Sequence, residues 1–141
     1  MSRIYWDTML FIYWLEDNPH FAKRVGAIRS RMEERKDQLI TSSFTFGELL
    51  AGVWRKGSGD LAVKTKGLLQ RSVSEVIPFT TEVAERYAQI RGTLGLGAAD
   101  SIHLSCAAQA RTDLFLTNDR GLVGKVVPGV QFIVTLDSAF F

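Results

Sequence analysis

The chain has 141 residues, of which 46% are hydrophobic and 23% charged, and its formal net charge is +2. This composition is that of a globular protein large enough to bury a core, so it excludes a disordered chain, and we expect one domain over residues 1–141. The charge is compatible with a polyanionic partner without requiring one. Cys106 is the single cysteine, which excludes an internal disulfide and a thiolate metal site.

The first half of the chain alternates short apolar strands with helices. Arg3–Trp6 favours a strand that passes at Asp7 into an apolar helix over Met9–Leu15. That apolar run is too short to cross a bilayer and no cleavage site follows it, so we expect a cytoplasmic protein without a membrane segment. The later elements of this half are a helix after Pro19 with apolar residues Phe21, Val25, Ile28 and Met32, a strand over Gln38–Thr41, and a helix beginning at Ser42.

The second half continues the alternation. Pro78 lacks an amide hydrogen, so the strand that contains it should end there or lie at a sheet edge. The predicted elements are a helix over Leu61–Arg71, a strand over Glu75–Phe79, a helix from Thr80 to Leu94, a helix after Gly97, a strand over Leu114–Leu116, and a last strand over Val130–Val134. The helix after Gly97 has no wide polar face, so it should be buried. Together these elements predict an α/β doubly wound domain with a parallel sheet covered on both faces.

Four acids stand out by their positions relative to these elements. Asp7 follows the first strand, Glu48 lies in the first turn after the second, Asp100 lies in the first turn of the buried helix, and Asp119 follows Leu114–Leu116. The carboxyl ends of parallel strands share one edge of the sheet, where ligands bind. We therefore expect these four side chains to converge there.

Each acid also has a purely structural interpretation. Asp7 could be a helix N-cap, Glu48 could complete a capping box with Thr45, Asp100 could complement a helix dipole, and Asp119 could close an Asx-turn. His103, one turn beyond Asp100, could reach the acids, although we favour a hydrogen-bonded helix histidine.

Four converging carboxylates without matching cations would repel one another unless a metal ion lay between them. Oxygen ligands without clustered His or Cys favour a hard ion such as Mg²⁺ or Mn²⁺, and one or two such ions suit hydrolysis of a phosphodiester. The hydroxyls of Thr8 and Thr117 and the amide of Asn118 lie where they could orient carboxylates or water.

At these residues the sequence resembles the PIN-domain family, in particular the small VapC-like toxins of toxin–antitoxin systems. The matching segments are Tyr5-Trp6-Asp7-Thr8, Phe46 to Gly52, Gly97 to Asp100 leading to Ala107-Ala108, and Leu116 to Asp119. The resemblance implies a three-layer α/β/α fold with a five-stranded parallel sheet, and makes Asp7, Glu48, Asp100 and Asp119 the catalytic, metal-binding acids. It also implies Mg²⁺- or Mn²⁺-dependent cleavage of RNA, a homodimer, and inhibition by a VapB-like antitoxin.

Two alternatives use the same scaffold. A DNA-directed or structure-specific nuclease would use the same acids on another substrate, and a non-catalytic module would bind nucleic acid without metal dependence. Basic side chains could follow a phosphate backbone in either case or could serve solubility alone. The candidates for RNA binding are Lys23, Arg24, Arg29, Arg55 and Lys56.

Overall fold

The computed structural model describes residues 1–138, and a five-stranded parallel sheet forms its centre. The strand order is β3-β2-β1-β4-β5, so the first strand of the chain is the central one. The strands are β1 (Arg3–Trp6), β2 (Gln38–Ser42), β3 (Glu75–Ile77), β4 (Thr112–Thr117) and β5 (Val130–Thr135). All neighbouring strands pair in parallel, as the alternation in the sequence predicts.

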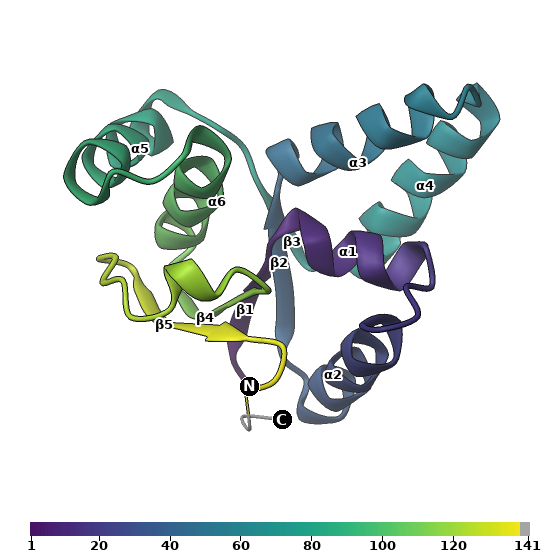
Figure 1. Ribbon diagram of the computed structural model, residues 1–141, viewed down its shortest axis with the longest axis horizontal. Coiled ribbons are helices and arrows are strands. Elements are labelled where there is room, and N and C mark those ends of the chain that lie inside the picture. The colour runs from purple at the N-terminus through teal and green to yellow at the C-terminus, as the bar shows by residue number, and fades with distance from the viewer. Residues whose placement is uncertain (139–141) are drawn as a thin grey trace.

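Helices cover both faces of the sheet (Figure 1). They are α1 (Thr8–Leu15), α2 (Ala22–Arg35), α3 (Ser43–Arg55), α4 (Gly59–Ser72), α5 (Thr81–Leu94) and α6 (Ala98–Gln109), with a short 3-10 helix, η1 (Arg120–Leu122). The helices α1 to α4 lie on one side of the sheet, and α5 and α6 lie on the other. The predicted three-layer α/β/α fold is therefore confirmed.

The strand residues alternate between two cores. Ile4 and Trp6 are fully buried among side chains of α1 to α4, whereas Tyr5 is buried among those of α5 and α6. This is the two-residue period of a strand that is covered on both faces. The central position of β1 follows from its sequence, because Ile4, Tyr5 and Trp6 leave no polar face for solvent.

Polar side chains define where several helices begin. The side chains of Ser42, Ser58 and Thr80 accept hydrogen bonds from backbone amides in the first turns of α3, α4 and α5. Because the first amides of a helix have no partner within it, such caps fix the starting residue. The cap at Ser58 starts α4 two residues before Leu61, where the apolar pattern alone places its beginning.

The buried helix and the edge strand agree with prediction. In α6 the side chains from His103 to Ala108 are buried, and Cys106 is among them with no exposed surface. Burial raises the pKa of the Cys106 thiol to about 11, as expected of an inert core cysteine. The strand β3 lies at the sheet edge and ends one residue before Pro78. Between residues 1 and 138 no helix is both long and apolar enough to span a membrane.

The loop before β5 touches α6 at Gly129. Its φ angle is 98°, and a Cβ atom there would lie 2.7 Å from the carbonyl oxygen of Ala108. We expect Gly129→Ala to lower the free energy of unfolding by about 2 kcal/mol or more, because both the backbone conformation and the contact are unfavourable. Urea denaturation would measure the loss. Gly92→Ala is the control, since a Cβ there meets no atom within 4 Å and should not destabilise α5.

Candidate active site

The four acids come to one edge of the sheet through its topology. Asp7 directly follows β1, and Asp119 lies two residues after the end of the adjacent strand β4. The helix α3 leaves the carboxyl end of β2 and carries Glu48 in its second turn. Because α6 leads into the start of β4, its own first turn, with Asp100, lies at the opposite end of that strand, which is the carboxyl edge.

Asp7 is the most buried of the four acids, with 8% of its surface exposed. It caps α1, and its Oδ1 atom accepts a hydrogen bond of 3.0 Å from the backbone amide of Met9. Burial raises the pKa of Asp7 above its ordinary value, while a hydrogen bond from Thr117 and the nearby imidazole of His103 oppose the rise. The capping role considered for Asp7 is thus real, and it fixes the carboxylate at the edge of the sheet.

Glu48 is held by two neighbours at a single oxygen. The Thr8 hydroxyl donates to its Oε1 atom, and Nε2 of His103 lies 3.1 Å from the same atom. The contact with His103 lowers the pKa of Glu48, burial opposes this, and the bond from Thr8 adds to it. The capping box with Thr45 is not formed, because the amide of Thr45 and the hydroxyl of Ser42 make the cap at this helix start.

Asp100 and Asp119 form a pair of like charges. Asp100 is half-buried and Asp119 is exposed. Burial raises the pKa of Asp100, and the negative charge of Asp119 raises it further. Asp119 also caps η1, and its Oδ1 atom accepts a hydrogen bond of 2.9 Å from the amide of Gly121. The Asx-turn considered for Asp119 therefore coexists with its electrostatic contact to Asp100.

The two remaining polar candidates hold the loop that carries Asp119. The hydroxyl of buried Thr117 accepts a hydrogen bond from the amide of Asp119, at 3.0 Å. The side-chain amide of Asn118 donates to the Tyr13 hydroxyl on α1, also at 3.0 Å. Together with the bond from Thr117 to Asp7, these contacts tie the end of β4 to the start and the middle of α1.

No lysine or arginine among residues 1–138 forms an ion pair with any of the four acids, and the pair of Glu48 with His103 is the only one they make there. Uncompensated carboxylates of this kind suit a hard divalent cation. However, within the described chain no three His, Cys, Asp or Glu side chains are arranged to ligate one ion. Hydrogen bonds hold one oxygen each of Asp7, Glu48 and Asp119.

The basic candidates have different surroundings. The guanidinium of Arg24 donates to the backbone carbonyls of Leu136 and Ser138, and that of Arg29 lies 4.5 Å from the centre of the Trp14 ring. Lys23 is exposed on the same helix. These contacts show that Arg24 and Arg29 hold neighbouring segments together. Arg55 and Lys56 line a groove that also reaches Glu48.

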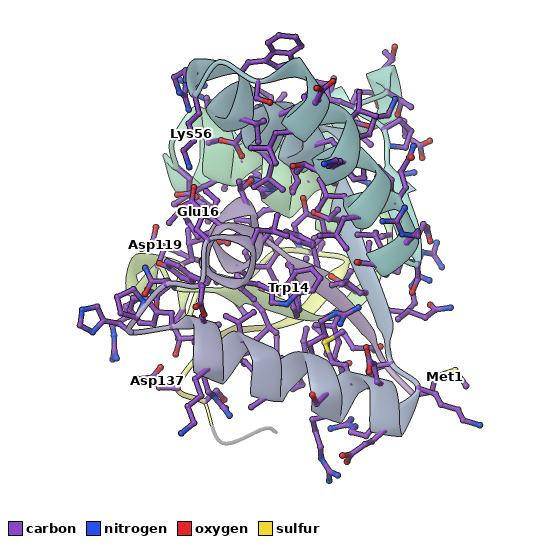
Figure 2. All side chains as sticks on the ribbon, turned by 90° about the vertical axis from the view of Figure 1, so that its right-hand side faces the viewer. Met1, Trp14, Glu16, Lys56, Asp119 and Asp137 are labelled. Atoms are coloured by element: carbon purple, nitrogen blue, oxygen red, sulfur yellow. The ribbon has the colours of Figure 1, made fainter. Side chains whose placement is uncertain are left out.

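An apolar groove of about 610 Å³ runs from Glu48 between α1, α3 and α4. Its walls include Leu15, Leu49, Leu61 and Leu68, and Arg55, Lys56 and Lys64 add positive charge. Glu16 and Lys56 form an ion pair of 2.9 Å across it, and Figure 2 shows both along the same edge of the view as Asp119. Leu61 is 44% exposed and lines this groove, so the apolar stripe predicted for α4 is only partly buried in the core.

The sequence matches the PIN domain family over residues 4–125. The chain belongs to the PIN-domain family. As a family, PIN domains are nucleases that depend on divalent metal ions, and the matched range contains all four acids. No curated protein sequence matches the chain significantly.

Solved structures share the PIN fold of this chain. VapBC2 from Rickettsia felis, bound to a DNA fragment from its promoter, is 17% identical with a TM-score of 0.75, covering 94% of this chain and 98% of that chain. FitAcB from Neisseria gonorrhoeae is 29% identical with a TM-score of 0.64, covering 84% and 88%. VapBC-5 from Mycobacterium tuberculosis, a toxin–antitoxin family member, is 18% identical with a TM-score of 0.61, covering 96% and 99%.

Sequence reasoning left the surroundings of His103 open, and the structure shows both interpretations at once. His103 is a buried, hydrogen-bonded helix residue, and it also contacts Glu48 among the PIN-domain acids. The signal in the sequence is its spacing, because a residue three positions after Asp100 lies on the same side of the helix.

Proposed function

We propose that this PIN domain is a Mg²⁺- or Mn²⁺-dependent endoribonuclease and the toxin of a toxin–antitoxin pair. The single observation that supports this best is the meeting of uncompensated carboxylates at one sheet edge, where the charge of Asp119 raises the pKa of Asp100. Like charges this close are tolerated when a cation is shared between them. The resemblance of the sequence to VapC-like toxins supports the choice of RNA, and the toxin–antitoxin assemblies among its structural neighbours support an antitoxin partner.

In this proposal Asp7, Glu48, Asp100 and Asp119 would hold the divalent ions. Such an ion, when bound, activates a water molecule and neutralises charge on the leaving oxygen of the phosphodiester. The protein contributes the placement of its own groups. Thr117 hydrogen-bonds Asp7 and the amide of Asp119, so it couples the two acids that follow β1 and β4. Thr8 fixes Glu48 from the first residue of α1.

The choice between RNA and DNA is tested by digestion with one preparation. Purified protein would be incubated with single-stranded RNA, duplex DNA and flap DNA, each with Mg²⁺, Mn²⁺ or a chelator. We expect metal-dependent cleavage of RNA alone. Cleavage of flap DNA in preference to RNA would support the structure-specific nuclease instead, and nucleic acid binding without any cleavage would support the non-catalytic module. Sequencing of RNA ends after induced expression would then locate the cleaved bond.

The groove beside Glu48 supports the proposed antitoxin. Its apolar walls and its positive charges at Arg55, Lys56 and Lys64 fit a partner segment that carries both apolar and acidic side chains. A segment seated there would also cover Glu48. An antitoxin bound in this way would block RNA from the acids, whereas Arg55 and Lys56 in the free protein could meet the phosphate backbone. The expected homodimer stays a prediction.

Leu61→Glu tests this groove. The change places a negative charge on the apolar wall, so we expect it to weaken binding of the proposed antitoxin at least about tenfold, measured by calorimetry. RNA cleavage by the free protein should be unchanged. Val63→Glu is the matched control, because Val63 is 73% exposed on the same helix and does not line the groove. Equal losses in both variants would contradict the assignment of the groove.

A further inference from the structure

His103 connects the interior of the protein to the acidic edge. It comes from α6 and is 4% exposed. Its Nδ1 atom lies 2.8 Å from the Tyr5 hydroxyl, and its Nε2 atom lies 3.1 Å from both Oε1 of Glu48 and Oγ1 of Thr8. Three elements that are distant in sequence, β1, α3 and α6, are thus joined through one imidazole ring.

The inner end of this connection is rigid. Tyr5 is fully buried on the central strand, and its ring stacks on Phe115 with a centroid distance of 5.2 Å and an interplanar angle of 6°. Its hydroxyl lies 2.9 Å from Oγ of Ser42, which caps α3, the helix that carries Glu48. The ring of Phe44 packs against His103 at 5.2 Å. The imidazole therefore has little freedom to turn.

Hydrogen-bond chemistry sets the roles of the two ring nitrogens. An ionised carboxylate can only accept, so the contact with Glu48 requires a hydrogen on Nε2. The Tyr5 hydroxyl can donate to Nδ1 or accept from it, so it satisfies that nitrogen in either protonation state. Nε2 is thereby directed at Glu48.

Thr8 and His103 contact the same oxygen of Glu48. No hydrogen bond to the other oxygen, Oε2, is formed by any residue from 1 to 138. Glu48 therefore has one fixed oxygen and one that is left to face the acidic edge. A mobile surface glutamate loses side-chain conformational entropy when it binds an ion. Because Glu48 is already held in place, less entropy is lost when the ion binds.

We propose that His103 is a positioning residue, which holds the Glu48 carboxylate in the orientation that binds a divalent ion, with Tyr5 fixing the imidazole from the interior. The inference rests on the proposed function, in which Glu48 is one of the metal-binding acids. It goes further by assigning a task to two residues that do not contact the ion or the RNA. The lowered pKa of Glu48, caused first by His103, agrees with this contact.

Two amide substitutions separate the two ends of the imidazole. In His103→Gln the amide nitrogen can reach the place of Nε2 and still donate to Glu48. In His103→Asn the shorter side chain reaches only the place of Nδ1, so it keeps a contact with Tyr5 and loses Glu48. Both variants bury a similar neutral amide, so their effects on folding are matched. Mn²⁺ affinity of the full chain would be measured by electron paramagnetic resonance, and thermal unfolding would be followed without metal.

We expect His103→Asn to lower Mn²⁺ affinity about tenfold or more and His103→Gln to change it several-fold less, the range found for groups that orient metal ligands. In RNA cleavage at saturating Mn²⁺, His103→Asn should lower kcat with little change in KM. Equal Mn²⁺ affinities for the two variants would overturn the inference, as would a wild-type protein that binds no Mn²⁺. If neither variant folds, Tyr5→Phe decides: reduced Mn²⁺ affinity supports the inference and unchanged affinity overturns it.

The same measurements keep this inference distinct from the proposed function. A wild-type protein that binds Mn²⁺ but cleaves no RNA would refute the ribonuclease. The ratio of the Mn²⁺ affinities of His103→Gln and His103→Asn would still test the role of His103. Conversely, if RNA cleavage persists but His103→Gln and His103→Asn bind Mn²⁺ equally well, the ribonuclease proposal is supported and the positioning role of His103 is refuted.

Discussion

Asp7→Asn is expected to reduce metal-dependent RNA cleavage by at least about 10³-fold, because it removes a buried carboxylate from the centre of the acidic edge. Asparagine keeps the shape of the side chain and can still cap α1 by accepting from Met9, so the fold should survive. Cleavage of a labelled RNA with Mg²⁺ and with Mn²⁺ would measure the loss.

A matched control for that loss is Asp60→Asn, which removes the same charge from an exposed position in the first turn of α4. It should retain full activity. Asp100→Asn should behave like Asp7→Asn, since the two acids belong to the same edge. Wild-type rates in both Asp7→Asn and Asp100→Asn would refute the catalytic assignment, and circular dichroism would show whether any loss comes from unfolding.

The same Asp7→Asn substitution is expected to stabilise the protein when no metal is present. Burial raises the pKa of Asp7 in the folded state above the unfolded value of 3.8, so the folded state binds that proton more tightly. The stability from protonated Asp7 is fully present below that unfolded value and is lost as the pH rises through the folded pKa. Above its folded pKa Asp7 is a buried, ionised carboxylate, so removing that charge should stabilise the protein there by about 1 kcal/mol.

The advantage of Asp7→Asn should shrink as the pH falls through the raised folded pKa of Asp7, because the wild-type carboxyl then takes up its proton. At neutral pH, Mn²⁺ should make the wild type more stable than Asp7→Asn. An ion at about a hundred times its Kd adds about 2.7 kcal/mol to the wild type, or roughly 5–10 °C in Tm for a chain of this size. Calorimetric scans with chelator and with Mn²⁺ would follow both effects. A variant less stable than the wild type in chelator would contradict the first effect, and a wild type that Mn²⁺ leaves unchanged would contradict the second.

The fold was predictable because its signals are local. Arg3–Trp6 is apolar at every position after Arg3, which indicates a strand covered on both faces, and β1 is indeed the central strand. Asp7 and Asp119 could be placed because each lies within two residues of the end of a buried strand. The start of α4 was misplaced because it depends on the Ser58 cap, whereas the apolar pattern begins at Leu61.

The side-chain contacts of the site were beyond sequence reasoning, because they join residues far apart in the chain. His103 lies 98 positions from Tyr5 and 55 from Glu48, and no local pattern reports either separation. Arg24 likewise belongs to a basic stripe that reads as solvated, yet it binds carbonyls more than a hundred positions away. In each case the pairing of strands decides which distant side chains meet.

The strand order has a consequence for when the acidic edge can form during synthesis of the chain. β1 is synthesised before β2 and β3, but one of its two neighbours, β4, is synthesised only after both of them. Asp7 can therefore meet Asp119 only after all the residues between them have been made. A nascent chain that ends before β4 lacks part of the acidic edge, so this edge can assemble only after β4 has left the ribosome.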